Sequence, residues 1–289
     1  MYQINQYIEA ETLQEAIEAL SANENAQIIA GGTDVLIKTR ERKGGYVDRD
    51  LVGITRIESI HGIRMEGGDL LIGATTCFTD VEENEHILRH IPLLATAVGM
   101  VGGPQIRNIG TIGGNVANGA TSADSASSLF ALDAIICLEG KEGKRELAIK
   151  DFYQGPGKVD LKQGELLTHI RIPKASFEGY KGHYIKFAQR KAMDIATLGC
   201  AVLVKENNGI IEDLKIAFGV AGPTPIRATE AEAFAKGKAI TDENLEAIGE
   251  ACLANASARD SWRASKAFRE QLIRELPKRG IRIALGGGR

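Results

Sequence analysis

The stretch IIAGGTDVLI, residues 28–37, and the stretch GPQIRNIGTIGGNVANGATSAD, residues 103–124, each place a glycine pair beside small polar residues. In both, the pair follows a run that favours a β-strand. A glycine pair lets the backbone adopt positive φ and approach a ligand closely, and successive N–H groups in such a turn form a concave site for an anion. Thr33 and Thr111 add hydroxyl donors. Two such turns facing each other predict a pyrophosphate site, and the alternative is two tight turns that serve structure alone.

Three charged residues accompany these stretches. Asp34 and Asp124 would repel a phosphate, so we expect them to accept hydrogen bonds from sugar hydroxyls. The structural alternatives are a helix N-cap for Asp34 and the first turn of a helix for Asp124. Arg107 precedes the second glycine pair, where it either screens the phosphates or forms an ordinary ion pair.

Several common motifs are absent from the sequence. No G-x-G-x-x-G follows a strand, which argues against a Rossmann fold. Residues 155–159 contain a Gly-Lys pair without the spacing of a P-loop. There is no G-x-S-x-G nucleophile elbow and no H-E-x-x-H zinc motif. We therefore assign neither a catalytic residue nor a metal ligand.

The composition indicates a soluble globular protein. The chain has 289 residues, of which 44% are hydrophobic and 25% charged, and a net charge of −3, which argues against a nucleic-acid partner. No apolar run reaches the roughly 18 residues of a membrane span, and the N-terminus lacks the pattern of a signal peptide. The four cysteines are scattered without a C-x-x-C pair, as expected for free thiols in the cytoplasm.

Local patterns predict several element boundaries. Residues 12–15, TLQE, form a capping box at the start of a helix. The sequence Asn-Asn-Gly at 207–209 predicts a hairpin between two strands. The last helix should end before Pro277, because proline inside a helix costs about 3 kcal/mol.

A polar stretch at residues 173–182 carries one proline and two glycines. It predicts a boundary between a domain of residues 1–176 and a domain of residues 177–289. In the second domain, strands precede helices, which favours an α+β layer domain.

Taken together, the two glycine-pair stretches closely resemble the FAD-binding (medium) subunit of the molybdenum-containing hydroxylases, the xanthine dehydrogenase family. The likeness continues through YQGPGKVDL, ELLTHIRIP, KFAQRKAMDIATLGCAVLV, AFGVAGPTPIRATEAE and WRASKAFREQL, and covers nearly the whole chain. It implies an α+β fold in which a vanillyl-alcohol-oxidase or PCMH-type FAD-binding domain of two subdomains precedes a smaller α+β domain. Such a fold binds FAD without a Rossmann motif, which explains the missing fingerprint.

The resemblance assigns cofactor-binding residues by position. One side of the FAD pyrophosphate is wrapped by Ile28, Ile29, Ala30, Gly31, Gly32, Thr33, Asp34 and Val35. The other side is closed by Thr111, Gly113, Gly114 and Asn115. Asp124 would hold ribityl or ribose hydroxyls, and Leu167 would contact the flavin ring. Lys186 would lie near the pyrimidine edge, and Ile195 against a flavin face.

The resemblance also implies partners. A large subunit would carry the molybdenum cofactor, a small subunit would carry 2Fe-2S clusters, and this chain would pass electrons through FAD to NAD in a dimer of heterotrimers. Xanthine or another purine is the expected substrate class. The alternatives are the FAD subunit of a nicotinate-type or carbon monoxide-type dehydrogenase, a cell-wall-precursor reductase that shares the fold, and a non-catalytic nucleotide-binding module.

Overall fold

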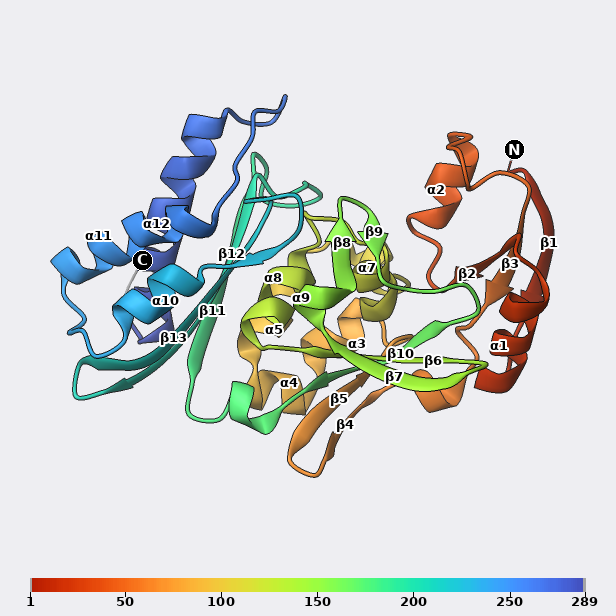
Figure 1. Cartoon of the computed structure of the whole chain (residues 1–289), viewed down its shortest axis with the longest axis horizontal. Coiled ribbons are helices and arrows are strands. Elements are labelled where there is room, and N and C mark those ends of the chain that lie inside the picture. Colours follow the sequence, from red (N-terminus) through yellow and green to blue (C-terminus); the bar gives the residue numbers. More distant parts are fainter. Residues whose placement is uncertain (1, 288–289) are drawn as a thin grey trace.

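The computed structural model describes residues 2–287. Three sheets follow one another along the long axis of the molecule, from the N-terminal end to the C-terminal end (Figure 1). A parallel sheet of three strands comes first, an antiparallel sheet of five strands lies in the middle, and an antiparallel sheet of four strands comes last. No helix formed by residues 2–287 combines the length and the apolar character needed to cross a bilayer.

The N-terminal sheet has the strand order β1-β3-β2. Its elements are β1 (Ile4–Glu9), α1 (Leu13–Ala22), β2 (Ala26–Ile29), α2 (Val35–Arg40) and β3 (Arg49–Gly53). The predicted capping box is confirmed: the Thr12 side chain accepts from the Glu15 N–H, and the Glu15 carboxylate accepts from the Thr12 N–H. The chain leaves β2 through Gly32, whose φ of 69° favours glycine.

The central sheet has the order β4-β5-β10-β6-β7. Its strands are β4 (Ile63–Glu66), β5 (Asp69–Gly73), β6 (Ile135–Gly140), β7 (Gly143–Ala148) and β10 (Leu166–Ile172), with the small pair β8 (Tyr153–Gly155) and β9 (Lys158–Val159) beside it. The helices are α3 (Phe78–Glu83), α4 (Glu85–His90), α5 (Pro92–Gly99), α6 (Pro104–Arg107), α7 (Ile112–Ala117), α8 (Asp124–Ala131) and α9 (Ile149–Phe152). One apolar cluster joins this sheet to its helices.

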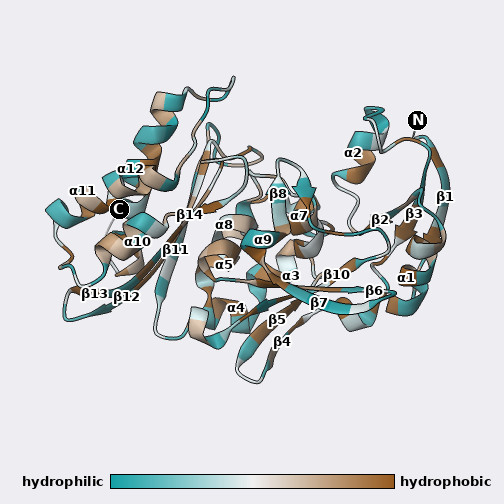
Figure 2. Ribbon diagram, in the orientation of Figure 1, coloured by the Kyte–Doolittle hydropathy of each residue, from teal (hydrophilic) through white to brown (hydrophobic). Residues whose placement is uncertain are grey.

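The C-terminal sheet contains β11 (Lys181–Phe187), β12 (Leu198–Asn207), β13 (Ile210–Gly219) and β14 (Ile226–Arg227). One of its faces is covered by α10 (Thr229–Ala235), α11 (Asp242–Ala251) and α12 (Lys266–Ala284), and the other packs toward α5 and α8. These helices carry both hydrophobic and hydrophilic patches (Figure 2), as expected when one face covers a sheet. The predicted hairpin is confirmed, with positive φ at Asn208 and Gly209.

The predicted end of the last helix is wrong. Helix α12 continues through Pro277 to Ala284, and both Pro277 and Gly280 are buried. A Cβ at Gly280 would lie 2.8 Å from Val202 Cγ2, so glycine lets the helix lie close against β12. The stabilisation gained by packing α12 against the sheet therefore outweighs the stabilisation lost with the backbone hydrogen bond that the proline removes.

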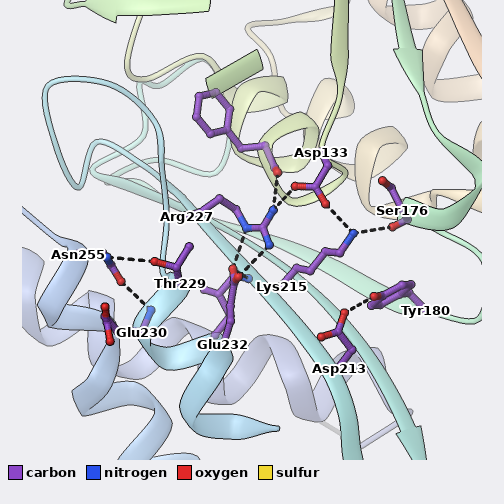
Figure 3. A network of polar contacts seen from close by, with 12 residues as sticks. Asp133, Ser176, Tyr180, Asp213, Lys215, Arg227, Thr229, Glu230, Glu232 and Asn255 are labelled. Atoms are coloured by element: carbon purple, nitrogen blue, oxygen red, sulfur yellow. Dashed lines mark hydrogen bonds and ion pairs between the residues drawn. The ribbon is translucent and has the colours of Figure 1, made fainter. Parts of the chain in front are cut away.

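A polar network ties the C-terminal sheet to the end of α8 (Figure 3). Asp133, in the turn after α8, accepts from Lys215 Nζ at 2.8 Å and is ion-paired with Arg227. The Arg227 guanidinium also pairs with Glu232 on α10, and Lys215 Nζ donates to the Ser176 carbonyl. The network therefore joins the C-terminal end of α8 to β13, β14 and α10.

Candidate functional site

A cavity of about 390 Å³ separates the N-terminal sheet from the central part of the chain. Both predicted glycine-pair segments line it. The predicted residues found on its walls are Ile28, Ala30, Gly31, Gly32, Thr33, Asp34, Val35, Thr111, Gly113, Gly114, Asn115 and Leu167. The structure thus brings together segments that lie about eighty residues apart in the chain. The volume is in the range of small-molecule sites.

The first segment presents free backbone donors. The N–H groups of Gly31, Gly32, Thr33 and Asp34 donate to no acceptor within residues 2–287. They connect the end of β2 to the start of α2, and all four residues line the cavity. Consecutive N–H groups without protein partners are the requirement for a backbone anion site.

Gly31 has a steric role rather than the positive φ expected for a glycine pair. A Cβ at this position would lie 1.9 Å from Ile109 O and 2.9 Å from Gly110 Cα. Gly31 does not have positive φ, whereas its neighbour Gly32 does. The missing side chain therefore allows the backbones of the two cavity walls to touch.

The second segment differs from the prediction. Gly113 and Gly114 lie inside helix α7 and neither has positive φ; the run before them contains the helix α6, which begins at Pro104, and is not a strand. The N–H groups of Gly113 and Gly114 donate to Ala74 O and Thr111 Oγ1. This segment therefore supplies no backbone anion nest, and Gly113 instead allows close contact with Ala74, whose Cβ would lie 2.6 Å from an added Cβ.

Side chains replace backbone donors on this wall. Asn115 Oδ1 accepts from Ser125 Oγ at 2.7 Å, and Asn118 Oδ1 accepts from Lys38 Nζ at 2.7 Å. Because the amide oxygens of Asn115 and Asn118 accept these bonds, their N–H₂ groups have no acceptor in the described part of the chain. Both residues line the cavity, so these N–H₂ groups can donate to a ligand there. Thr111 keeps its hydroxyl hydrogen, because the Gly114 bond uses its oxygen as acceptor.

Lys38 connects the two walls. Its ammonium group pairs with Asp34 and donates to Asn118 Oδ1 and to Tyr46 OH. Burial disfavours the cation, but Asp34 and Tyr46 together outweigh that effect and raise the pKa of Lys38. Asp34 precedes α2 at the N-cap position, yet its side chain makes no capping bond and faces this lysine instead.

A second cavity of about 300 Å³ adjoins the first. Val101 and Asn115 line both cavities. The second is also lined by Asp124 and by Ile195, whose side chain is 48% exposed on the loop between β11 and β12. The two cavities together can therefore accommodate one extended ligand.

A buried ion pair borders the second cavity. Lys186 Nζ donates to Asp124 Oδ2 at 2.8 Å and to Met100 O at 2.9 Å, and Tyr184 OH donates to Asp124 Oδ1 at 2.8 Å. Burial raises the pKa of Asp124, and the charge and hydrogen bonds of Lys186 and Tyr184 oppose that shift. Burial beside Asp124 also raises the pKa of Tyr184 well above its usual range, so this hydroxyl keeps its proton and donates.

Three residues that the sequence analysis places at or beside the site, Ile29, Arg107 and Lys186, line neither cavity. Ile29 is buried and lines neither cavity. Arg107 forms an ion pair with Glu82 at 3.2 Å and also lines neither cavity, so the ordinary ion pair is the correct alternative. Within residues 2–287, no three His, Cys, Asp or Glu side chains are grouped closely enough to hold a metal ion.

Sequence reasoning missed several polar residues of the site. Lys38, Asn118, Gln27 and Arg49 line or bridge the first cavity, and no local pattern marks them. Tyr184 lies two residues before Lys186 on strand β11 and therefore shares its face, so the alternation of side chains along a strand was a usable signal for it.

The comparisons with known proteins agree with this geometry. The family model described as the FAD binding domain in molybdopterin dehydrogenase matches residues 2–175. The chain belongs to the family of molybdopterin dehydrogenase FAD-binding subunits. In this subunit, residues 183–284 match the model of the CO dehydrogenase flavoprotein C-terminal domain. The family resemblance and the fold class predicted from the sequence are both confirmed.

Relatives of this FAD-binding subunit extend over its whole length. It is 42% identical over 292 residues to the xanthine dehydrogenase FAD-binding subunit of Escherichia coli O157:H7, covering 100% of this chain and 99% of that protein. It is 31% identical to the glyceraldehyde dehydrogenase medium chain of Sulfolobus acidocaldarius, over 96% of both. A solved carbon monoxide dehydrogenase from Hydrogenophaga pseudoflava superimposes with a TM-score of 0.93 at 30% identity, covering 99% of both chains.

Proposed function

We propose that this subunit holds FAD in the two joined cavities and passes electrons between the flavin and NAD in a xanthine dehydrogenase-type assembly. The observation that carries the proposal is the row of four backbone N–H groups, Gly31 to Asp34, which have no acceptor in residues 2–287 and belong to residues that line the first cavity. A pyrophosphate supplies several anionic oxygens to such a row.

The residues present fit the cofactor. Gly31 and Gly113 create space that a Cβ would fill. The opposite wall adds neutral donors from Asn115, Asn118 and Thr111. Lys38 contributes a cation near the row of N–H groups. The donor set therefore suits an anion held between two walls, as the FAD pyrophosphate would be.

The flavin half would extend toward the second cavity. There we propose that Asp124 accepts hydrogen bonds from ribityl hydroxyls, held in place by Tyr184. Lys186 would place positive charge near the pyrimidine edge, where it favours an anionic reduced flavin. Leu167 would contact the ring from the first cavity, on the side of Ala74, whose N–H donates to Thr168 O.

FAD supplies the two-electron chemistry when bound. The chain controls access to the flavin ring. Ile195 stands half-exposed at the edge of the second cavity. An aliphatic side chain of this size is compatible with a nicotinamide that stacks on the ring. The 42% identity to a xanthine dehydrogenase subunit supports NAD as acceptor and a purine as substrate of the assembly.

Related assemblies are the second candidate. Identities of 30% and 32% to carbon monoxide and nicotinate dehydrogenase subunits support these substrate classes less strongly. For a xanthine dehydrogenase-type assembly and for these related ones, we propose that a large partner subunit carries the molybdenum cofactor and a small partner subunit carries the 2Fe-2S clusters. The whole would be a cytoplasmic dimer of heterotrimers. The free state of Cys77, Cys137, Cys200 and Cys252 is consistent with that compartment.

The test uses the purified chain saturated with FAD. Stopped-flow absorbance should show flavin reduction by NADH, and xanthine should not be oxidised until the two partner subunits are added. Flavin that dithionite reduces but NADH does not would contradict NAD as acceptor. Heterocycle oxidation by the chain alone would contradict the division of labour.

A further inference from the structure

Residues 2–53 form a lobe with its own apolar core at one end of the molecule (Figure 1). The buried side chains of this N-terminal lobe make a cluster separate from the one under the central sheet. The lobe's cluster also includes Ile57 and Ile60, in the connection from β3 to β4, and Leu166 on β10. Apolar packing therefore joins the lobe to the central part at the place where the chain itself crosses.

Polar contacts reinforce this joint. Gln163, in the segment before β10, donates from Nε2 to Leu20 O of the lobe at 2.9 Å. Arg145 on β7 holds the same segment, because it forms ion pairs with Asp160 and Glu165. A backbone acceptor, two ion pairs and continuous apolar packing give this end of the lobe the character of a hinge.

The side of the lobe that carries α2 is held differently. In the view of Figure 1, α2 lies above the three strands, and α1, which carries Leu20, lies below them. From α2, Lys38 Nζ donates to Asn118 Oδ1, next to α7, at 2.7 Å. On its own side the ammonium group is ion-paired with Asp34 and lies 4.7 Å from the centre of the Tyr46 ring. Asp34, Tyr46 and Asn118 all line the cavity, so one hydrogen bond between two side chains bridges the walls here.

A ligand can enter between the two walls only if they separate. The backbones of the walls already touch, since a Cβ at Gly31 would lie 1.9 Å from Ile109 O. A hydrogen bond between two side chains can break and form again without unfolding either wall. The Lys38–Asn118 bond is therefore suited to open and close with the lobe.

We infer that the N-terminal lobe is a clamp that opens about the Gln163 end, and that Lys38 and Asn118 form the latch that holds it shut on the ligand. In this role Lys38 is a positioning residue that sets how long the ligand stays bound, in addition to the charge it places near the row of N–H groups. The inference rests on the proposed function for the identity of the ligand, FAD.

The first test needs no ligand, because amide hydrogen exchange reports local opening of the free chain. Asn118→Ala breaks the latch from the wall opposite α2. Residues 35–49 should then exchange about tenfold faster than in the wild-type chain, since a hydrogen bond to a charged group is worth about that factor. Unchanged exchange in β6 and β7 shows that the variant is folded. Wild-type exchange at residues 35–49 in this variant would overturn the inference.

The second test follows FAD dissociation by flavin fluorescence in Lys38→Met, in Asn118→Ala and in the double variant. Each single variant should release FAD about tenfold faster, with association no slower than in the wild-type chain. The double variant should release FAD at most about threefold faster than the faster single variant, because one bridge cannot be broken twice. A rate equal to the product of the two single effects would mean that each residue contacts FAD independently, and would overturn the latch.

Lys43→Met, in the exposed turn after α2, is the matched control and should keep the wild-type dissociation rate. A wild-type chain that binds no FAD would contradict the proposed function. The exchange experiment on the free chain would still decide whether the latch exists, so the two failures are distinguishable.

Discussion

Gly31→Ala should weaken FAD binding, because it separates the two walls of the cavity. The added Cβ would lie 1.9 Å from Ile109 O, whereas real Cβ contacts begin near 3.0 Å. Neither neighbour can rotate away, since both clashing groups are backbone. The walls must therefore move apart by about 1 Å, and overpacking of this kind costs about 1–3 kcal/mol.

We expect part of this cost in the stability of the free chain and part in FAD affinity. A loss of about 1.4 kcal/mol is tenfold in the dissociation constant, so FAD should bind roughly ten times more weakly. Titration followed by flavin fluorescence measures the affinity, and thermal unfolding without FAD measures the stability. Gly44→Ala, where the added Cβ meets no atom within 4 Å, is the control and should leave both unchanged. A Gly31→Ala chain with wild-type FAD affinity would refute the role assigned to this contact.

Three further substitutions test other parts of the site. Tyr184→Phe removes a hydrogen bond of about 1 kcal/mol from Asp124, so FAD affinity in a fluorescence titration should fall severalfold; an unchanged affinity would contradict the positioning role. Ile195→Tyr should slow flavin reduction by NADH in stopped-flow experiments while FAD stays bound, and an unaltered rate would show that the residue does not control access. Asp133 has a φ of 47°, which asparagine also tolerates, so Asp133→Asn removes only the negative charge beside Lys215. Urea unfolding should then show a loss of about 1–2 kcal/mol in the free energy of unfolding, and no loss would mean that the network adds nothing to stability.

Patterns that act within a few residues were predictable from the sequence. The Thr12 capping box and the Asn208-Gly209 hairpin depend on groups that are neighbours in the chain, and both are confirmed. Pro277 broke the same kind of local rule, but the burial of α12 against β12 outweighed its helix-breaking preference. The boundary between residues 176 and 177 stays a prediction, which limited proteolysis would test.

Contacts across the fold were not predictable from one sequence. The Lys38–Asn118 hydrogen bond joins residues 80 positions apart, and the Lys186–Asp124 pair joins residues 62 apart. The resemblance identified Asp124 and Lys186 as site residues but did not reveal that they bond to each other. Nor could spacing alone show that Gly31 serves close backbone contact, because that depends on where Ile109 lies in the folded chain.

We expect this chain to bind one FAD between its glycine-pair segments and to hold no metal of its own. Equilibrium titration of the purified chain with FAD, combined with iron and molybdenum analysis of the same sample, tests it most directly. We expect saturation at one FAD per chain, with neither metal present in stoichiometric amount. A chain that binds no FAD, or one that carries stoichiometric iron, would contradict it.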